Sequence, residues 1–324
     1  MDLVGIRKNP IPRGSICDML ECGPKVKLRY ARWKPTTQRA KGTVCLFHGR
    51  NEFIEKYFEV IGELRKRGFA VATMDWRGQG RSTRMGGLSS AGHVDDFSEY
   101  DADMRVFMRE VVLPDCPPPY YALAHSMGAA VLINAACETG GPFDRIVASS
   151  PMISLHAGQT PRGLLGGIAG AASFFGLGSL PIGSFFDTHT ARDVASSHRL
   201  SSDVARIERN LAIVDKAPEL TSGPPTIGWL HAASRIMRRL SDPDFAERVH
   251  VPVLLTIGTL DTVVSVQAAE LMGRGLKNGG LVLVPGGKHE LMMDLDRVRD
   301  RFWGAFDAFV PGTRVYSPFE EPIL

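Results

Sequence analysis

Apolar residues along the chain fall into two alternating patterns. Short continuous apolar runs such as Thr43–Phe47 have the length of a buried strand, while segments such as Phe53–Lys66 repeat apolar residues every three or four positions, as an amphipathic helix does. The predicted strands are Lys25–Trp33, Thr43–Phe47, Phe69–Met74, Pro119–Ala124, Arg145–Ser149, Val251–Ile257 and Leu281–Val284. The predicted helices are Phe53–Lys66, Asp95–Val112, Met127–Cys137, Val266–Met272 and Val298–Phe309.

Strands that alternate with helices predict an α/β fold with a mostly parallel central sheet covered by helices on both faces. Lys25–Trp33 differs from the other strands because apolar and basic residues alternate along it. This alternation predicts a half-exposed antiparallel strand.

The alternation stops over residues 152–248, which we interpret as an inserted, mainly helical cap between two parts of the core, 1–151 and 249–324. Within it, Gly163–Phe186 carries no charge and is rich in Gly, Ala, Ser and Phe. Its glycines and proline make it a poor membrane span. Two interpretations remain open. The segment forms helices and loops packed on the core, or it forms a mobile apolar lid that covers an acyl-binding pocket and itself touches membrane or micelle surfaces. The later arginines are predicted on solvated helix faces: Arg199, Arg206, Arg209, Arg235, Arg238 and Arg239.

Composition limits the partners. The chain of 324 residues is 44% hydrophobic and 23% charged, as in soluble globular proteins, and its net charge of +3 does not suggest a nucleic-acid-binding protein. Five cysteines show no metal-ligand spacing, so no metal site is expected from them. Reduced thiols and a start without the profile of a secretory signal predict a cytoplasmic protein.

The strongest chemical signal is Ala124-His125-Ser126-Met127-Gly128, where an apolar strand turns directly into a helix. A serine at such a junction lies on a sharp turn with its hydroxyl exposed, and the residues two before and two after it must be very small. Ala124 and Gly128 meet that requirement. The alternative is an ordinary buried turn with an incidental serine.

A serine nucleophile needs a base and an acid, which in this architecture follow later strands in the order serine, acid, histidine. Val251–Ile257 leads to Asp261, and Leu281–Val284 leads to His289. We therefore expect Asp261 to orient His289 and His289 to deprotonate Ser126. The alternatives are a helix-capping role for Asp261 and a surface position for His289.

The tetrahedral intermediate also needs donors for its oxyanion. The backbone N–H of Met127 and that of Arg50, in the loop after Thr43–Phe47, are the candidates. His48, Glu52 and His125 are candidate pocket residues, although a structural role for His48 and a plain salt bridge for Glu52 are alternatives. His93, in another loop, also stays open as a residue that borders the pocket.

Taken together, these motifs resemble the α/β-hydrolase superfamily, and within it the monoacylglycerol lipase and bacterial lysophospholipase branch. The resemblance covers about residues 25 to 310 and implies the nucleophile, base, acid and oxyanion donors given above, as well as a cap after the sixth strand. Two positions depart from the pattern: Ala124 replaces a more usual glycine, and Arg50 stands where a small residue is common. The matching motifs are Phe47-His48-Gly49-Arg50-Asn51-Glu52-Phe53-Ile54-Glu55-Lys56-Tyr57, Asp75-Trp76-Arg77-Gly78-Gln79-Gly80-Arg81-Ser82, Ala124-His125-Ser126-Met127-Gly128, Gly258-Thr259-Leu260-Asp261 and Gly287-Lys288-His289-Glu290.

The sequence thus predicts a cofactor-independent serine hydrolase of carboxylic esters with an acyl chain, such as lysophospholipids or monoacylglycerols, that works through an acyl-enzyme. Three alternatives stay open: a carboxylesterase for small esters, an acyltransferase, and a non-catalytic binding protein on the same fold. No pattern in the sequence specifies an oligomeric state.

Overall fold

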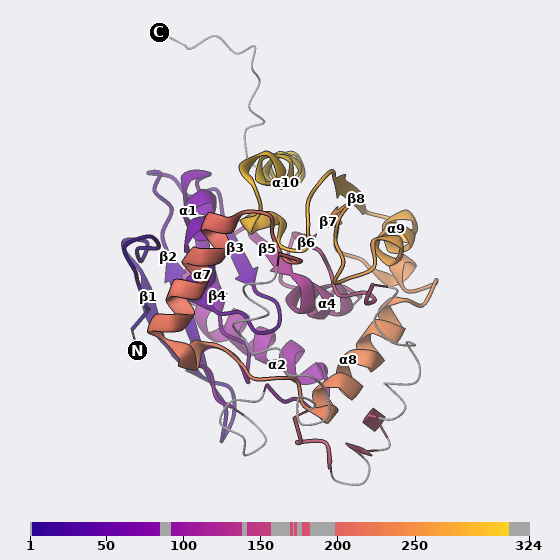
Figure 1. Ribbon diagram of the computed structural model, residues 1–324. Coiled ribbons are helices and arrows are strands. Elements are labelled where there is room, and N and C mark those ends of the chain that lie inside the picture. Colours follow the sequence, from indigo (N-terminus) through magenta and orange to yellow (C-terminus); the bar gives the residue numbers. More distant parts are fainter. Residues whose placement is uncertain are drawn as a thin grey trace.

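The computed structural model describes residues 2–84, 92–137, 141–156, 169–170, 172–173, 177–181 and 198–310. Its centre is an eight-stranded sheet in the order β1-β2-β4-β3-β5-β6-β7-β8 (Figure 1). The two β2 pairings, with β1 and with β4, are antiparallel, and the pairings from β4 to β8 are parallel. The strands are β1 Ile16–Glu21, β2 Lys27–Trp33, β3 Thr43–Phe47, β4 Ala70–Met74, β5 Tyr120–His125, β6 Arg145–Ser149, β7 Val253–Gly258 and β8 Gly279–Val284.

Helices cover both faces of this sheet, which confirms the predicted fold class. One core contains the inner sides of α1 and α10, and the other contains those of α2, α4, α8 and α9. The α-helices are α1 Phe58–Lys66, α2 Ser98–Phe107, α3 Leu113–Asp115, α4 Ser126–Ala135, α7 Val204–Lys216, α8 Ile227–Leu240, α9 Val266–Gly275 and α10 Asp296–Phe309. The 3-10 turns are η1 Ile54–Tyr57, η5 Pro218–Leu220, η6 Ala246–Arg248 and η7 Leu291–Met293, and a wider turn, η2 Met108–Val112, extends α2.

Strand β1 was not expected from the sequence, because only one of its six side chains is buried and its apolar pattern is weak. Strand β2 is antiparallel, as predicted, but the half-exposed interpretation is wrong at Arg29, whose side chain is 0% exposed. Its guanidinium donates to both Glu55 oxygens and to Asp75 Oδ2, each at 2.7 Å. Two carboxylates supplied by other segments therefore allow a charge to be buried in this strand.

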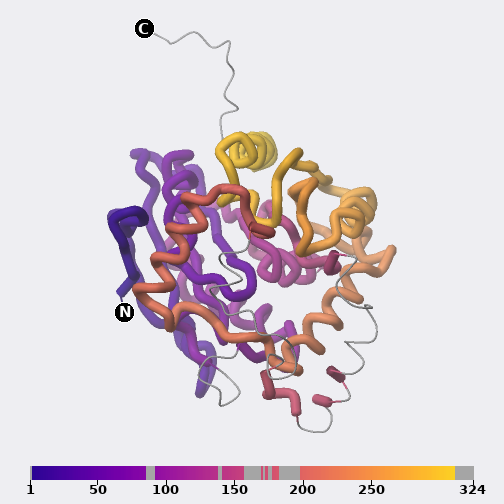
Figure 2. Tube along the Cα trace, in the orientation of Figure 1, coloured from indigo at the N-terminus to yellow at the C-terminus, as the bar shows by residue number. Residues whose placement is uncertain are grey.

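Between β6 and β7 the chain forms α7 and α8, which lie apart (Figures 1 and 2). Helix α7 lies beside η1 and α1, and α8 packs against α4. The predicted division into core and cap remains a prediction. Most of the uncharged segment Gly163–Phe186 lies outside the described residues, so both interpretations of it stay open.

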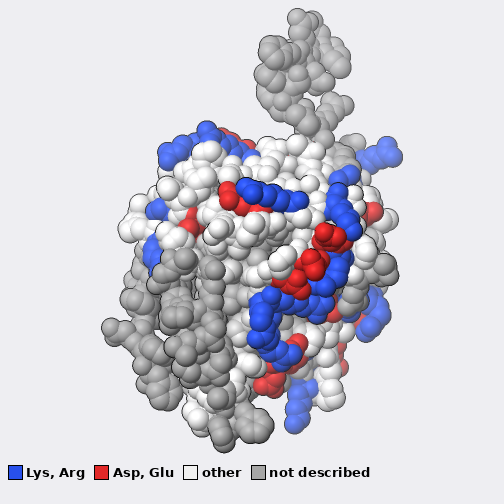
Figure 3. All heavy atoms as spheres, turned by 90° about the vertical axis from the view of Figure 1, so that its right-hand side faces the viewer, with Lys and Arg blue, Asp and Glu red and all other residues white. Residues whose placement is uncertain are grey.

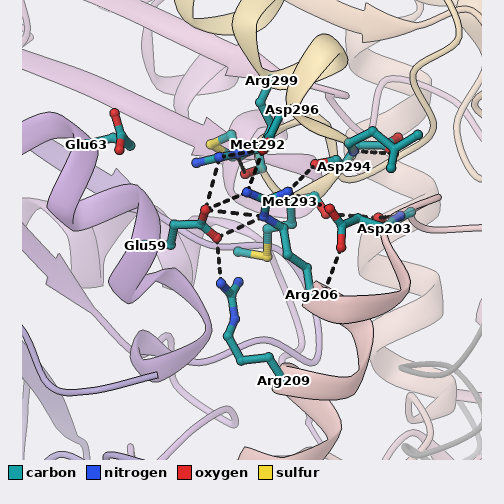
Figure 4. A network of polar contacts seen from close by, with 12 residues as sticks. Glu59, Glu63, Asp203, Arg206, Arg209, Met292, Met293, Asp294, Asp296 and Arg299 are labelled. Atoms are coloured by element: carbon teal, nitrogen blue, oxygen red, sulfur yellow. Dashed lines mark hydrogen bonds and ion pairs between the residues drawn. The ribbon is translucent and has the colours of Figure 1, made fainter. Parts of the chain in front are cut away.

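Ion pairs fasten α7 to the core (Figure 4). Glu59 of α1 accepts hydrogen bonds from Arg206 Nη2 at 2.7 Å and from Arg209 Nη1 at 2.5 Å, and Arg299 Nη1 of α10 lies 3.0 Å from the same carboxylate. Arg206 Nη2 also donates to Asp296 Oδ1 at 2.8 Å. The prediction of solvated faces is therefore wrong for Arg206 and Arg209, because acidic side chains from α1 and α10 face them.

The face that includes α8 and α9 carries mixed charge. In its described part, Lys and Arg side chains lie beside Asp and Glu side chains (Figure 3). Arg235 pairs with Asp96 at 2.9 Å, and Arg248 with Asp242 at 3.5 Å. In the described part of the chain, no helix combines the length and the apolar character needed to cross a bilayer.

Candidate active site

Ser126 lies at the junction of β5 and α4 with a backbone φ of 50°, in the left-handed region that side chains rarely adopt. Gly128 shows why the turn is possible: a Cβ there would lie 2.5 Å from the carbonyl oxygen of His48 and 2.9 Å from that of Phe47. Helix α4 therefore starts in direct contact with the end of β3. The turn has the geometry of a nucleophile elbow.

Ser126, His289 and Asp261 form one chain of hydrogen-bonded side chains. His289 Nε2 lies 3.1 Å from Ser126 Oγ, and His289 Nδ1 lies 2.8 Å from Asp261 Oδ2. Asp261 Oδ1 accepts the backbone N–H groups of Val263 and Val264 at 2.8 and 3.0 Å. Burial raises the pKa of Asp261, but the hydrogen bond with His289 and these backbone donors bring it below its ordinary value. An ionised Asp261 is suited to hold a proton on His289 Nδ1, which leaves Nε2 free to accept from the serine.

The loops after β7 and β8 bring the acid and the histidine together. Gly258 ends β7 so close to Gly287 that a Cβ would lie 2.1 Å from the Gly287 carbonyl oxygen. That same oxygen accepts the N–H of Leu260 at 2.9 Å. The glycines of the two motifs therefore bind one loop to the other and fix the spacing between Asp261 and His289.

The loop after β3 lies against the serine. A Cβ on Gly49 would lie 3.2 Å from Ser126 Cβ, so the backbone of Gly49, which leads directly to Arg50, lies against the serine. The Gly49 N–H donates to Glu52 Oε2 at 2.5 Å. Met127 follows Ser126 in the first turn of α4, where backbone N–H groups have no acceptor within the helix. The two candidate oxyanion donors thus belong to two segments that meet at Ser126.

A buried polar network connects this loop with the segment that carries His289. Glu52 accepts from Lys56 Nζ at 2.6 Å and from the Tyr57 hydroxyl at 2.7 Å, and it lies 3.1 Å from His125 Nδ1. Lys56 also donates to Glu290 Oε1 at 2.7 Å, and His125 Nε2 lies 3.2 Å from the carbonyl oxygen of His289. The network therefore connects the loop after β3 with the backbone of His289.

The charges in this network stabilise one another. Burial raises the pKa of Glu52, yet Lys56 and His125 bring it well below its ordinary value. Burial lowers the pKa of His125, while the Glu52 carboxylate raises it above its ordinary value overall. Lys56, Tyr57 and Glu290 lie inside the matching motifs, but their pattern there did not reveal this role.

A cavity of about 230 Å³ opens on Ser126 and His289. Residues from distant segments of the chain line it, and most of the lining surface is apolar. The apolar residues that line it are Phe53, Val263, Val264 and Met293 from outside residues 152–248, and Met152, Leu155, Leu200, Ile207, Val214 and Trp229 from within that range. An apolar cavity next to a nucleophile is suited to hold an acyl chain.

Among the candidate pocket residues, Glu52 and His125 line this cavity and His48 does not. The His48 ring is turned toward Asp75, with Nε2 at 3.6 Å from Oδ1, and its Nδ1 lies 2.8 Å from the Gly49 carbonyl oxygen. These contacts place His48 outside the cavity and correspond to the structural role that was its alternative. His93 is buried against Thr226, whose Oγ1 lies 2.7 Å from Nδ1.

The sheet, the covering helices and the Ser126 turn define the class of this protein as an α/β-hydrolase. Residues 38–296 match the family model described as serine aminopeptidase, S33, and the chain belongs to that family.

Named relatives and a solved structure are similar over most of the chain. It is 26% identical to lysophospholipase L2 of Escherichia coli strain K12 over 288 residues, which cover 85% of this chain and 81% of the relative. It is 24% identical to the probable lysophospholipase L2 of Haemophilus influenzae, with 85% of each chain covered. A soluble variant of monoglyceride lipase from Saccharomyces cerevisiae, solved with a substrate analog, has the same fold at a TM-score of 0.72 and 19% identity, with 91% and 95% of the two chains covered.

Proposed function

We propose that this chain hydrolyses carboxylic esters of acyl lipids, of the lysophospholipid or monoacylglycerol type, with Ser126 as the nucleophile. The hydrogen-bonded chain from Asp261 through His289 to Ser126, at the wall of an apolar cavity, carries the proposal. Its lysophospholipase-named relatives, which match over most of the sequence, support the lipid substrate class.

The mechanism follows from the positions of these groups. Ser126 Oγ attacks the ester carbonyl while His289 Nε2 takes its proton, and the N–H groups of Arg50 and Met127 donate to the resulting oxyanion. The tetrahedral intermediate expels the alcohol, which His289 protonates, and leaves an acyl group on Ser126. Water then attacks this acyl group as His289 removes its proton, and the fatty acid leaves as the Ser126 hydroxyl reforms.

The proposal is tested by Ser126→Ala and a panel of esters. Loss of the nucleophile is expected to lower kcat by about 10⁴-fold or more, because the histidine and acid cannot act without it. Ser98→Ala, at an exposed position in the first turn of α2, is the matched control and is expected to retain activity. Turnover by purified Ser126→Ala at the unmutated rate, or no labelling of Ser126 by a fluorophosphonate, would contradict the proposed nucleophile.

The substrate class is tested with esters that cross acyl length with leaving group: glycerol, phosphocholine, phosphoethanolamine and p-nitrophenol. We expect kcat/KM to rise with acyl length, because each methylene that enters the apolar cavity contributes about 0.8 kcal/mol. Highest activity on acetate and butyrate esters would instead indicate a small-ester carboxylesterase. Transfer of the acyl group to added glycerol in preference to water would indicate an acyltransferase.

A further inference from the structure

Arg50 carries a positive charge into the cavity without a carboxylate to balance it. Its Nη2 donates to the carbonyl oxygen of Gly223 at 2.8 Å, and its Cζ lies 5.0 Å from the centre of the Trp229 ring. Its Nε is buried and has no hydrogen-bond partner. Within the described residues, no acidic side chain forms an ion pair with it.

This arrangement differs from that of the four arginines whose residues are buried in the described chain, although the partly buried Arg84 also has only carbonyl and hydroxyl acceptors. Arg29 is paired with Glu55 and Asp75, and Arg77 with Asp103. Arg209 and Arg299 are both paired with Glu59. A charge removed from water without such a partner is costly. Burial lowers the pKa of Arg50 to about 10, which leaves the side chain charged at neutral pH.

The two acidic residues that line the cavity do not pair with Arg50. Glu52 and Glu290 both line the cavity, and both are bound to Lys56. An anion for Arg50 therefore has to come from whatever occupies the cavity. The Nε–H, which has no acceptor, belongs to an N–H edge of the guanidinium, and such an edge donates to phosphate oxygens in charge-assisted hydrogen bonds.

Arg50 also fixes where that anion would lie. Its backbone N–H is one of the two candidate oxyanion donors, so its side chain starts beside the reacting carbonyl and ends at Trp229, on the cap side of the cavity. In a lysophospholipid, a three-carbon glycerol unit separates the scissile ester from the phosphate. In a monoacylglycerol the same position carries an uncharged hydroxyl.

We propose that the Arg50 side chain recognises the phosphate of the leaving alcohol and makes this enzyme select lysophospholipids over monoacylglycerols. The inference rests on the proposed ester hydrolysis. It adds the chemistry of the head group and the residue that binds it.

The alternative role of Arg50 is to dock the cap on the core through Gly223 and Trp229. Arg84 provides a matched control for that role. It donates to Ser222 Oγ at 2.9 Å and to the Thr221 carbonyl oxygen at 3.1 Å, so it holds the same segment, but it is not among the residues that line the cavity. Arg50→Met and Arg84→Met thus each remove one positive charge that contacts residues 221–223. Arg50 does so from inside the cavity and Arg84 from outside it.

The experiment compares 1-decanoyl-lysophosphatidylglycerol with 1-decanoylglycerol below their micelle-forming concentrations. Unmutated enzyme is expected to have the higher kcat/KM on the phosphate ester. Arg50→Met is expected to lower the ratio of the two kcat/KM values by about 10- to 100-fold, the range for a hydrogen bond to a charged group. Arg84→Met is expected to leave the ratio unchanged. An equal loss on both substrates in Arg50→Met would overturn phosphate recognition and assign Arg50 to cap docking.

A second measurement needs no variant. Ether-linked 1-decylglycerol and its 3-phosphate cannot be hydrolysed and act as competitive inhibitors of the unmutated enzyme. The phosphate is expected to bind at least about 10-fold more tightly, and equal binding would overturn the inference. Glycerol 3-phosphate, which lacks the chain, is expected to compete weakly, and competition as strong as that of the chain-bearing phosphate would indicate a free-phosphate site instead.

The outcomes for the two decanoyl esters separate this inference from the proposed function. Hydrolysis of neither ester would contradict the proposed function, whereas equal hydrolysis of both would contradict only the selectivity.

Discussion

The strain at Ser126 is held in place by the contacts of its neighbours. A non-glycine residue in the left-handed region costs on the order of 1–3 kcal/mol and persists only where the surrounding structure leaves no alternative. Here α4 is pressed against the end of β3 at Gly128, and the backbone oxygen of Ser126 accepts the N–H of Met152 at 3.1 Å. The serine hydroxyl is thereby directed toward His289.

Gly128→Ala tests this contact. Its Cβ would lie 2.5 Å from the His48 carbonyl oxygen, so α4 and the β3 loop must separate. We expect a loss of about 1–3 kcal/mol of unfolding free energy from overpacking, together with a clear fall in kcat as Ser126 moves from His289 and the oxyanion donors. Urea unfolding and ester turnover measure the two effects.

Gly62→Ala is the control for Gly128→Ala. A Cβ at Gly62, in α1, would meet nothing within 4 Å. Alanine there is expected to stabilise the helix by about 0.5–1 kcal/mol without changing kcat. If both variants unfold and turn over alike, the close approach at Gly128 does not position the serine.

The candidate catalytic residues could be predicted because each follows a strand in an order that the mechanism requires. Ser126, Asp261 and His289 are each reached from a recognisable apolar run. The surroundings could not be predicted in this way, because they depend on side chains that approach from distant segments. Arg50 shows this: the sequence proposed its backbone N–H as a candidate donor, but only the folded chain shows that its guanidinium lacks a carboxylate partner.

At the scale of elements, α7 combines polar contacts to α1 and α10 with an apolar cluster in which Ile213 and Val214 pack with Phe53. Its inner side contributes Ile207, Asn210 and Val214 to the cavity, so the position of α7 determines the shape of that wall. Glu59 is the acid shared by the three arginines of the network in Figure 4. From the sequence, α7 reads as a polar helix, because the partner that buries its arginines lies more than a hundred residues away.

Glu59→Gln is expected to destabilise the protein in a pH-dependent way. Burial raises the pKa of Glu59, but hydrogen bonds from Arg206 and Arg209 lower it from 4.5 to about 2. A depressed folded-state pKa stabilises the fold above pH 4.5, and this contribution disappears as the pH falls toward 2. The variant should therefore lose about 1–3 kcal/mol near neutral pH, and its difference from unmutated protein should shrink in acid.

Glu63→Gln is the comparison for Glu59→Gln. Glu63 lies one turn further along α1, outside the network, and pairs with Lys66 and Arg67 near the surface. Its side chain is about as exposed as that of Glu59, but it pairs with two cations instead of three and one of them, Lys66, is 71% exposed, so its removal is expected to cost less than about 1 kcal/mol. Urea unfolding at several pH values checks both variants. An equal cost for the two, or a Glu59→Gln difference that grows in acid, would show that α7 is not held by this carboxylate.

For the whole molecule, the alternation of strands and helices predicted the parallel part of the sheet well, from β3 to β8. Its antiparallel side was predicted less well: β1 has too few buried residues to be recognised, and the buried charge in β2 appeared as an exposed one. The reason is physical. A parallel strand buried on both faces shows an apolar run, whereas a strand that holds an internal ion pair carries the polar residues of a surface strand.

Arg29 is the point where these parts of the molecule are joined. It lies in β2, while Glu55 is in η1 and Asp75 follows β4, and all three side chains are 0% exposed. Asp75 Oδ1 further accepts the Ile54 N–H at 3.0 Å.

Arg29→Met leaves two carboxylates buried without the guanidinium that pairs with both, and we expect it to cost about 3–5 kcal/mol of unfolding free energy. Arg32→Met, on the same strand, removes a partly exposed pair with Asp115 at 3.0 Å and should cost less than about 1 kcal/mol. Thermal or urea unfolding of the two variants gives the comparison. Similar losses would mean that the buried carboxylates take up protons or water at little cost, and that the antiparallel side of the sheet is held by its apolar packing instead.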